Sequence, residues 1–144
     1  MGKRYSFEVD KTVSYWFEGA TYDLGVAQAM LKAKKYPYAL FMGHLALEKV
    51  LKALVVKNTK THAPFSHSLP FLLERSSVEM PELMQTKLSE FMEFHFEARY
   101  PDAGKAFYKK CTKAYADSRL KEIKEVFRWI KTKLLGSSAS LRKD

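Results

Sequence analysis

Arg99, Tyr100 and Asp102 surround a proline at the point where a helical run ends. An arginine guanidinium binds a carboxylate or a phosphate through paired N–H bonds, and a tyrosine ring can stack on a nucleic-acid base. Because Pro101 pushes the residue before it out of the α region, the helix should stop here. Two interpretations stay open. Arg99 and Asp102 form a clasp that ends the helix, or the three polar residues belong to a ligand-binding site.

A second polar set lies within an otherwise apolar segment, where His44, Glu48 and Lys52 follow at four-residue steps. This spacing places the three side chains on one face of a helix. The simpler interpretation is a solvated strip with a Glu-to-Lys ion pair, and the alternative is that the strip lines a groove or a self-association surface. His67, in the loop that follows, can bond neighbouring backbone where the next helix starts.

Few residues favour metal or covalent chemistry. His44 and Glu48 are one helical turn apart, but no third ligand and no HExxH pattern accompany them, so we expect no metal. Neither Gly-rich phosphate-loop pattern is present, so we expect no bound cofactor, and an anion would have to bind at Arg99 or at helix N-termini. Lysines beside Cys111 would lower the pKa of its thiol, but no partner base is evident. His95 is expected to be a core histidine, and no catalytic residue is assigned.

The composition narrows the class of protein. The 144 residues include 25 Lys plus Arg against 16 Asp plus Glu, a net charge of +9 that attracts nucleic acid, nucleotides or an acidic partner. The single cysteine excludes an internal disulfide framework, and no secretory leader is evident. No run approaches the roughly 18 apolar residues of a membrane span. We therefore expect a soluble, cytoplasmic protein that makes no membrane contact.

Helical periodicity is the main pattern along the chain. Segment 38–56 is apolar around most of its circumference, so a helix there should be central. The apolar spacing and the Pro and Gly positions predict long helices over about 12–34, 37–57, 81–98 and 112–136, with a short helix over 69–74. The expected fold class is all-α: an up-and-down antiparallel bundle of four long helices plus a short helix.

Local signals mark where these helices should begin and end. Thr12 or Ser14 can cap the first helix, while Ser68 and Thr112 can cap the third and the last. Gly136 suits a C-terminal cap. We expect one helical bundle domain over residues 1–135, followed by a basic, flexible C-terminal tail over residues 136–144.

Four stretches taken together resemble the HEPN family. They are "DLGVAQAM" (Asp23 to Met30), "YALFMGHLALEKVLKALVV" (Tyr38 to Val56), "SHSL" (Ser66 to Leu69) and "ARYPD" (Ala98 to Asp102). The resemblance runs from about Val13 to Leu135. It implies an all-α bundle that is usually a homodimer and is often encoded beside a minimal nucleotidyltransferase, as a toxin–antitoxin or stress-response pair.

The resemblance also implies a nucleotide-binding or RNA-binding role, and some family members are metal-independent ribonucleases. Those members carry an arginine, four to six other residues, and then a histidine. Counted from Arg99, the permitted positions hold Gly104, Lys105 and Ala106, so the expected histidine is absent. His95, one helical turn before Arg99, could replace it.

These observations favour a HEPN-type module that binds a nucleotide, RNA or a nucleotidyltransferase partner without the usual ribonuclease motif. The expected ligand-binding residues are Arg99, Tyr100, Asp102, Glu48, Lys52 and His67. The alternatives are a metal-independent ribonuclease toxin with an unconventional base and a pure protein-interaction subunit.

Overall fold

The computed structural model describes residues 7–99 and 105–143, and for residues 137–143 it describes the backbone alone. Within these ranges the chain forms no strand, and its helices are α1 (Val9–Lys32), α2 (Tyr36–Thr59), α3 (Leu69–Ser76), α4 (Glu82–Glu97), α5 (Lys105–Lys110) and α6 (Lys113–Lys143). No helix in this part of the chain is long and apolar enough to cross a membrane. The all-α prediction is confirmed, whereas the short helix α5 was not predicted.

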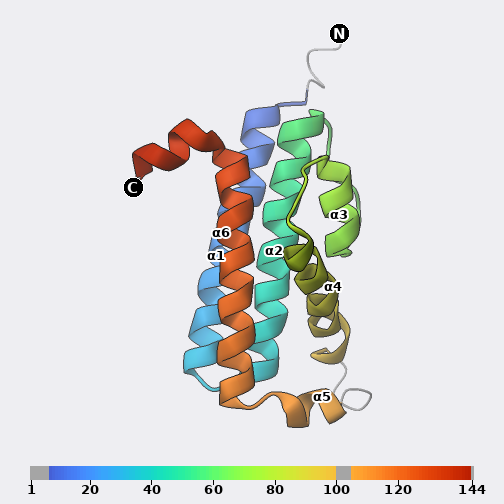
Figure 1. Cartoon of the computed structure of the whole chain (residues 1–144), viewed down its shortest axis with the longest axis vertical. Helices are drawn as coiled ribbons and strands as arrows, with labels where there is room; N and C mark the ends of the chain where they lie inside the picture. The colour runs from blue at the N-terminus through green and yellow to red at the C-terminus, as the bar shows by residue number, and fades with distance from the viewer. Residues whose placement is uncertain (1–6, 100–104, 144) are drawn as a thin grey trace.

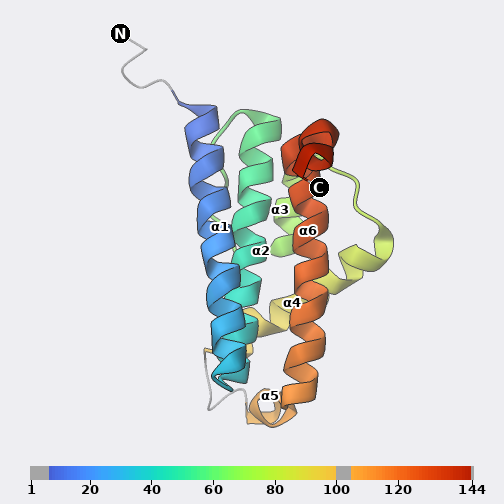
Figure 2. The same cartoon turned by 90° about the vertical axis from the view of Figure 1, so that its left-hand side faces the viewer.

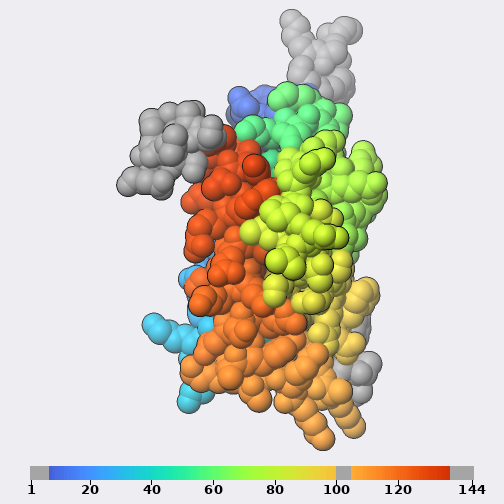
Figure 3. Space-filling model, in the orientation of Figure 1, coloured from blue at the N-terminus to red at the C-terminus, as the bar shows by residue number. Residues whose placement is uncertain are grey.

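Successive long helices reverse direction along the chain; α1, α2 and α6 follow the longest axis of the molecule, whereas α4 crosses this axis obliquely (Figures 1 and 2). α1 and α6 lie on one side of α2, and α3 and α4 lie on the other, while α5 closes the end at which α6 begins (Figures 1 and 2). In the space-filling view α6 covers much of this face, and only the edge of α1 is visible beyond it (Figure 3). The observed arrangement is the predicted antiparallel bundle.

α2 is the central rod of the bundle, as its apolar circumference predicted. It contacts α1, α3, α4 and α6, and most of its residues from Ala39 to Val56 are buried. The predicted apolar stripe of the last helix packs in the same core. Its six members are all buried: Ala116, Leu120, Ile123, Phe127, Ile130 and Leu134. Burial of these two apolar surfaces is the main stabilising term of the fold.

Two of the predicted caps form and one does not. Ser68 Oγ accepts the backbone N–H of Phe71 at 3.2 Å, and Thr112 Oγ1 accepts that of Tyr115 at 3.2 Å. The prediction for the first helix is wrong, because α1 begins at Val9, before both Thr12 and Ser14, and Glu8 at its cap position makes no side-chain capping bond.

Gly136 marks a break within α6. Its backbone lies at φ 82° and ψ 159°, a conformation that glycine adopts without the steric cost of a Cβ, and the helix changes direction there. The predicted end of the last straight helix thus coincides with a kink, after which the backbone is helical again as far as Lys143. The division into a domain and a flexible tail at this position stays a prediction.

Two helical glycines provide a matched test of how tightly α2 packs on α6. A Cβ at Gly43 would lie 2.8 Å from Cδ1 of the buried Ile123, whereas one at Gly25 on α1 would meet no atom within 4 Å. Both alanine substitutions gain about 1 kcal/mol of helix propensity, but only Gly43→Ala overpacks the core, at a cost of about 1–3 kcal/mol. In urea unfolding, Gly43→Ala should be less stable than Gly25→Ala by about that cost. Equal stabilisation by both changes would contradict the close packing.

Candidate functional site

Glu48 is a carboxylate buried within the apolar rod α2, with 5% of its surface exposed. Its Oε2 accepts a hydrogen bond from Lys52 Nζ at 2.9 Å, and Lys52 is itself buried, with its ammonium 5.1 Å from the centroid of the Trp16 ring. The predicted Glu-to-Lys pair is confirmed, but the prediction of a solvated strip is wrong. A buried charge is costly unless it is paired, so Glu48 depends on its partners.

His67 is the second partner of Glu48. Its Nδ1 lies 3.1 Å from Oε1 and 3.2 Å from Oε2. An ionised carboxylate only accepts hydrogen bonds, so Nδ1 carries the proton and donates it. The His67 side chain is 64% exposed, and Nε2 is the ring nitrogen that does not contact Glu48. The expected bond from His67 to the backbone at the helix start is replaced by this contact, and Ser68 caps α3 instead.

His95 connects His67 to Arg99. The rings of His67 and His95 stack with centroids 4.7 Å apart. One turn further along the chain, Arg99 Nε donates to the His95 carbonyl at 3.0 Å, and Arg99 Nη2 lies 3.2 Å from His95 Nε2. A guanidinium only donates, so His95 Nε2 is the acceptor and its proton resides on Nδ1. The bond to this carbonyl places the Arg99 charge at the C-terminal end of α4, where a cation is favourable.

Two aromatic side chains complete what we call the Glu48 cluster, whose members are Phe41, His44, Glu48, Lys52, His67, His95 and Arg99. Phe41 lies 5.8 Å from the Arg99 guanidinium carbon, measured to the ring centroid, a cation–π distance. His44 is fully buried, with its ring centroid 4.9 Å from that of His95. Among the described residues neither ring nitrogen of His44 has a hydrogen-bond partner of normal geometry.

Burial determines the charge state of two imidazoles of the cluster, those of His44 and His95. It lowers the pKa of His44 to about 4, against a smaller upward effect of the Glu48 carboxylate. Burial is also the first cause that lowers the pKa of His95, and the neighbouring Arg99 charge lowers it further. Both rings are therefore neutral near pH 7. Two exposed members of the cluster carry groups that can contact a ligand, Arg99 and His67.

The structure brings together four of the six predicted site residues. Glu48, Lys52, His67 and Arg99 belong to one connected series of contacts, with His95 as the link. Tyr100 and Asp102 lie outside the described residues, and so does the predicted Arg99–Asp102 clasp. The sequence prediction missed the contribution of Phe41, although Phe41, His44 and Glu48 follow at helical spacing on one face of α2.

Other candidate chemistry finds less support. In the described part of the chain no three His, Cys, Asp or Glu side chains are arranged to hold a metal ion. The expectation that lysines lower the pKa of Cys111 is wrong. Burial raises that pKa to about 11, and the opposing effect of Lys110 is smaller. A buried thiol with a raised pKa is a poor nucleophile.

The neutral His44 predicts a loss of stability in acid. Its pKa is about 4 in the folded chain and 6.5 for the free side chain, so the unfolded state binds the extra proton between these values. The stabilisation is present above pH 6.5 and is lost as the pH falls through about 4, and the shift corresponds to roughly 3 kcal/mol. In urea unfolding at neutral pH and near pH 4, His44→Leu should lose less free energy of unfolding than the unsubstituted chain. Equal losses in the two proteins would contradict this role.

Comparison with solved structures identifies the same helical arrangement. The crystal structure of TT1696 from Thermus thermophilus matches with a TM-score of 0.73 and 24% sequence identity, covering 84% of this chain and 97% of that one. The crystal structure of ST0689, an archaeal HEPN homologue, matches with a TM-score of 0.67 and 23% identity, covering 85% and 97%. At these identities the likeness shows the fold. No curated protein sequence matches the chain.

The sequence itself matches a family model. The model described as HEPN domain covers residues 13–133, from the first turns of α1 into the last straight part of α6. It therefore includes every described member of the Glu48 cluster. This match shows that the chain belongs to the HEPN domain family.

Proposed function

We propose that this HEPN module binds a phosphate-bearing ligand, a nucleotide or RNA, at the Glu48 cluster. The observation that carries the proposal is the contact of both Arg99 and His67 with one histidine, His95. A guanidinium matches the geometry of a phosphate through two N–H donors, and the His67 ring beside it supplies a third donor from Nε2 when both of its nitrogens are protonated. The net charge of +9 would draw an anionic ligand towards the chain.

The predicted ligand-binding residues have different roles in this proposal. Arg99 and His67 would contact the phosphate. Glu48 and Lys52 are buried, so they would position His67 rather than touch the ligand. Tyr100 and Asp102 follow Arg99 directly and would extend the site. The Phe96 ring, 56% exposed and edge-on to His95, provides a surface on which a base could stack.

The remaining parts of the proposal rest on family membership. We propose a homodimer that pairs with a minimal nucleotidyltransferase, within a toxin–antitoxin or stress-response pair. Two exposed aromatic side chains support a protein contact: Phe96, which lies edge-on to His95, and Phe65, two residues before His67 in the chain. A pure protein-interaction subunit would retain these contacts without binding a nucleotide.

Substitution of Arg99 tests the ligand-binding proposal. Arg99→Ala should weaken binding of labelled ATP and of a short RNA by about tenfold or more, because it removes a charge-assisted bidentate contact worth at least ~1.4 kcal/mol. Fluorescence anisotropy at moderate salt measures both affinities. Arg75→Ala is the matched control, since Arg75 contacts the Phe71 ring away from the cluster. Identical binding curves for Arg99→Ala and the unsubstituted chain would contradict the proposal that Arg99 binds the ligand.

A ribonuclease is the second candidate, and His67 is the observation that favours it. Its Nδ1 proton is held by Glu48, so Nε2 of this exposed side chain has a lone pair that can accept a proton. In RNA cleavage Nε2 would take the proton of a 2′-hydroxyl, the 2′-oxygen would attack phosphorus, and the 5′-oxygen would leave with a proton returned to it. His95 is less suited than the sequence suggested, because its Nε2 faces Arg99 and its pKa is lowered.

Cleavage assays with EDTA present separate the two candidates. If the chain is a ribonuclease, His67→Ala should lower the rate about 10²–10⁴-fold, the usual contribution of a general base. Glu48→Gln should shift the pH profile of the rate, because Glu48 acts through His67. His62→Ala, in the same loop, is the control. RNA that stays intact with the unsubstituted chain leaves phosphate binding as the function, whereas cleavage that survives His67→Ala excludes His67 as the base.

A further inference from the structure

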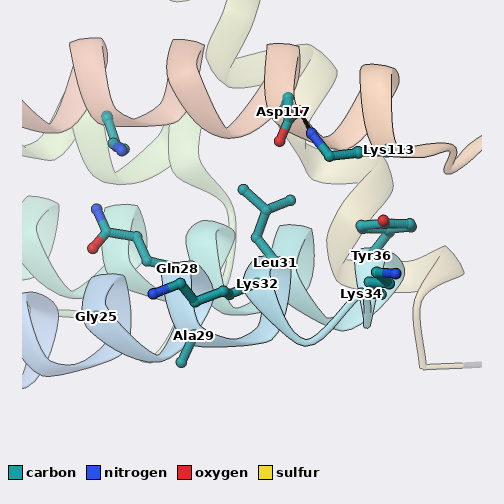
Figure 4. Close-up of a pocket in the computed structure, with 10 residues that line it drawn as sticks. Gly25, Gln28, Ala29, Leu31, Lys32, Lys34, Tyr36, Lys113 and Asp117 are labelled. Carbon is teal, nitrogen blue, oxygen red and sulfur yellow. Dashed lines mark hydrogen bonds and ion pairs between the residues drawn. The ribbon is translucent and has the colours of Figure 1, made fainter.

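Two neighbouring hollows follow the seam between α1 and α6. The larger, of about 740 Å³, extends from Tyr36 and the start of α6 along the last turns of α1 (Figure 4). The smaller, of about 270 Å³, continues beside Phe127. Gln28 and Lys124 line both hollows. The two therefore form one groove, which we call the α1–α6 groove. It lies on the opposite side of α2 from α3 and α4 (Figures 1 and 2).

The groove carries an excess of positive charge. Its basic side chains are Lys32, Lys34, Lys113, Lys124, Arg128 and Lys131, and its acidic side chain is Asp117. Asp117 is paired with Lys113 at 2.8 Å. Among the described residues none of the other five basic side chains forms an ion pair. Six positive groups against one negative group leave an excess of five, so no acidic neighbour in the groove neutralises these lysines and Arg128.

The shape of the groove is linear. From Lys113 to Lys131 the charges follow α6 over about 27 Å, at 1.5 Å per residue. Leu31 points from α1 into the space between the helices, and Tyr36 lies at the end nearest Lys113 (Figure 4). On the α1 side the wall includes Gly25, where an added Cβ would meet nothing within 4 Å. The result is an open channel with basic edges and an apolar floor.

The α1–α6 groove lacks the large exposed apolar side chains that would hold a helix of a partner protein. Helices dock in grooves through large apolar anchors, but the exposed large apolar side chains of the described chain are Tyr15, Tyr22, Tyr38, Phe65, Phe71, Leu83 and Phe96. None of these lines the α1–α6 groove. A row of unpaired cations beside an aromatic ring is instead the pattern with which proteins follow a nucleic-acid backbone without reading its sequence.

We propose that the α1–α6 groove is a second binding surface, which takes the phosphate backbone of single-stranded RNA. The basic side chains neutralise successive phosphates, and the Tyr36 ring stacks against a base at the end of the groove. This surface is separate from the Glu48 cluster, so it does not depend on a phosphate bound at Arg99.

The salt dependence of RNA binding tests the groove. Labelled oligouridine is titrated by fluorescence anisotropy over a range of NaCl concentrations. The triple variant Lys32→Gln, Lys124→Gln and Lys131→Gln should lower the slope of log affinity against log salt by about 2, since each lost phosphate contact removes about 0.7. At low salt its affinity should fall by at least about tenfold. Lys11→Gln, on an exposed lysine of α1 outside the groove, should change neither quantity.

Two substitutions at Gly25 separate the effect of a negative charge in the groove from the effect of a larger side chain there. Gly25→Gln and Gly25→Glu place side chains of equal size in the open channel, and the unobstructed Cβ position predicts that both fold. Gly25→Glu should weaken oligouridine binding several-fold more than Gly25→Gln, because only the carboxylate repels the phosphates. Poly-glutamate should compete weakly with RNA in the unsubstituted chain.

Three results would overturn the proposal: an unchanged slope in the triple variant, equal affinities of the two Gly25 variants, or poly-glutamate that competes as well as RNA. The last result would assign the groove to an acidic protein. The experiments distinguish a failure of the groove proposal from a failure of the proposal that the Glu48 cluster binds phosphate. Arg99→Ala should leave most of the salt slope intact, and the triple variant should still bind ATP if Arg99 binds phosphate.

Discussion

The burial of one carboxylate organises the Glu48 cluster, the proposed ligand-binding site of this protein. Glu48 lies in the central helix, where an unpaired charge would be strongly destabilising. Lys52 supplies one partner from the same helix, and His67 supplies the other from the loop between α2 and α3. The second contact joins that loop to α2 and fixes the direction of the His67 ring. His95 stacks on this ring and accepts a hydrogen bond from Arg99, so the end of α4 is joined to the same carboxylate through two further contacts.

The central position of α2 separates two surfaces of different chemistry. On the side of α3 and α4, α2 contributes a compact cluster in which two imidazoles are neutral and two polar groups face solvent. On the side of α1 and α6, the α1–α6 groove carries five basic side chains that form no ion pair with any described residue. The compact cluster suits one phosphate group with precise geometry. The groove suits a repeating charge, because its positive groups are spread along a helix rather than converging on a point.

Much of the fold was predictable from the sequence because local patterns determine it. Apolar spacing located the long helices, and the caps at Ser68 and Thr112 depend on residues close in the chain. The errors arose where contacts between segments far apart in the sequence determine whether a side chain is buried. Glu48 and Lys52 form a polar strip in sequence, but Trp16 and His67 contact this strip, and Trp16 lies more than thirty residues away in the chain. Cys111 has basic neighbours in sequence, yet burial controls its pKa. Helix α5 has six residues, too few to show an apolar period in the sequence, and its buried residue is Phe107.

The tautomer of His67 tests the central claim most directly. Nitrogen NMR of the histidine side chains at slightly alkaline pH identifies which ring nitrogen carries the proton in each imidazole. If the Glu48 carboxylate holds this ring, His67 carries its proton on Nδ1, and added ATP shifts the Nε2 resonance of His67 while leaving that of the buried His44 in place. A proton on Nε2 of His67, or an ATP titration that moves neither His67 nor the Arg99 side chain, would contradict the account.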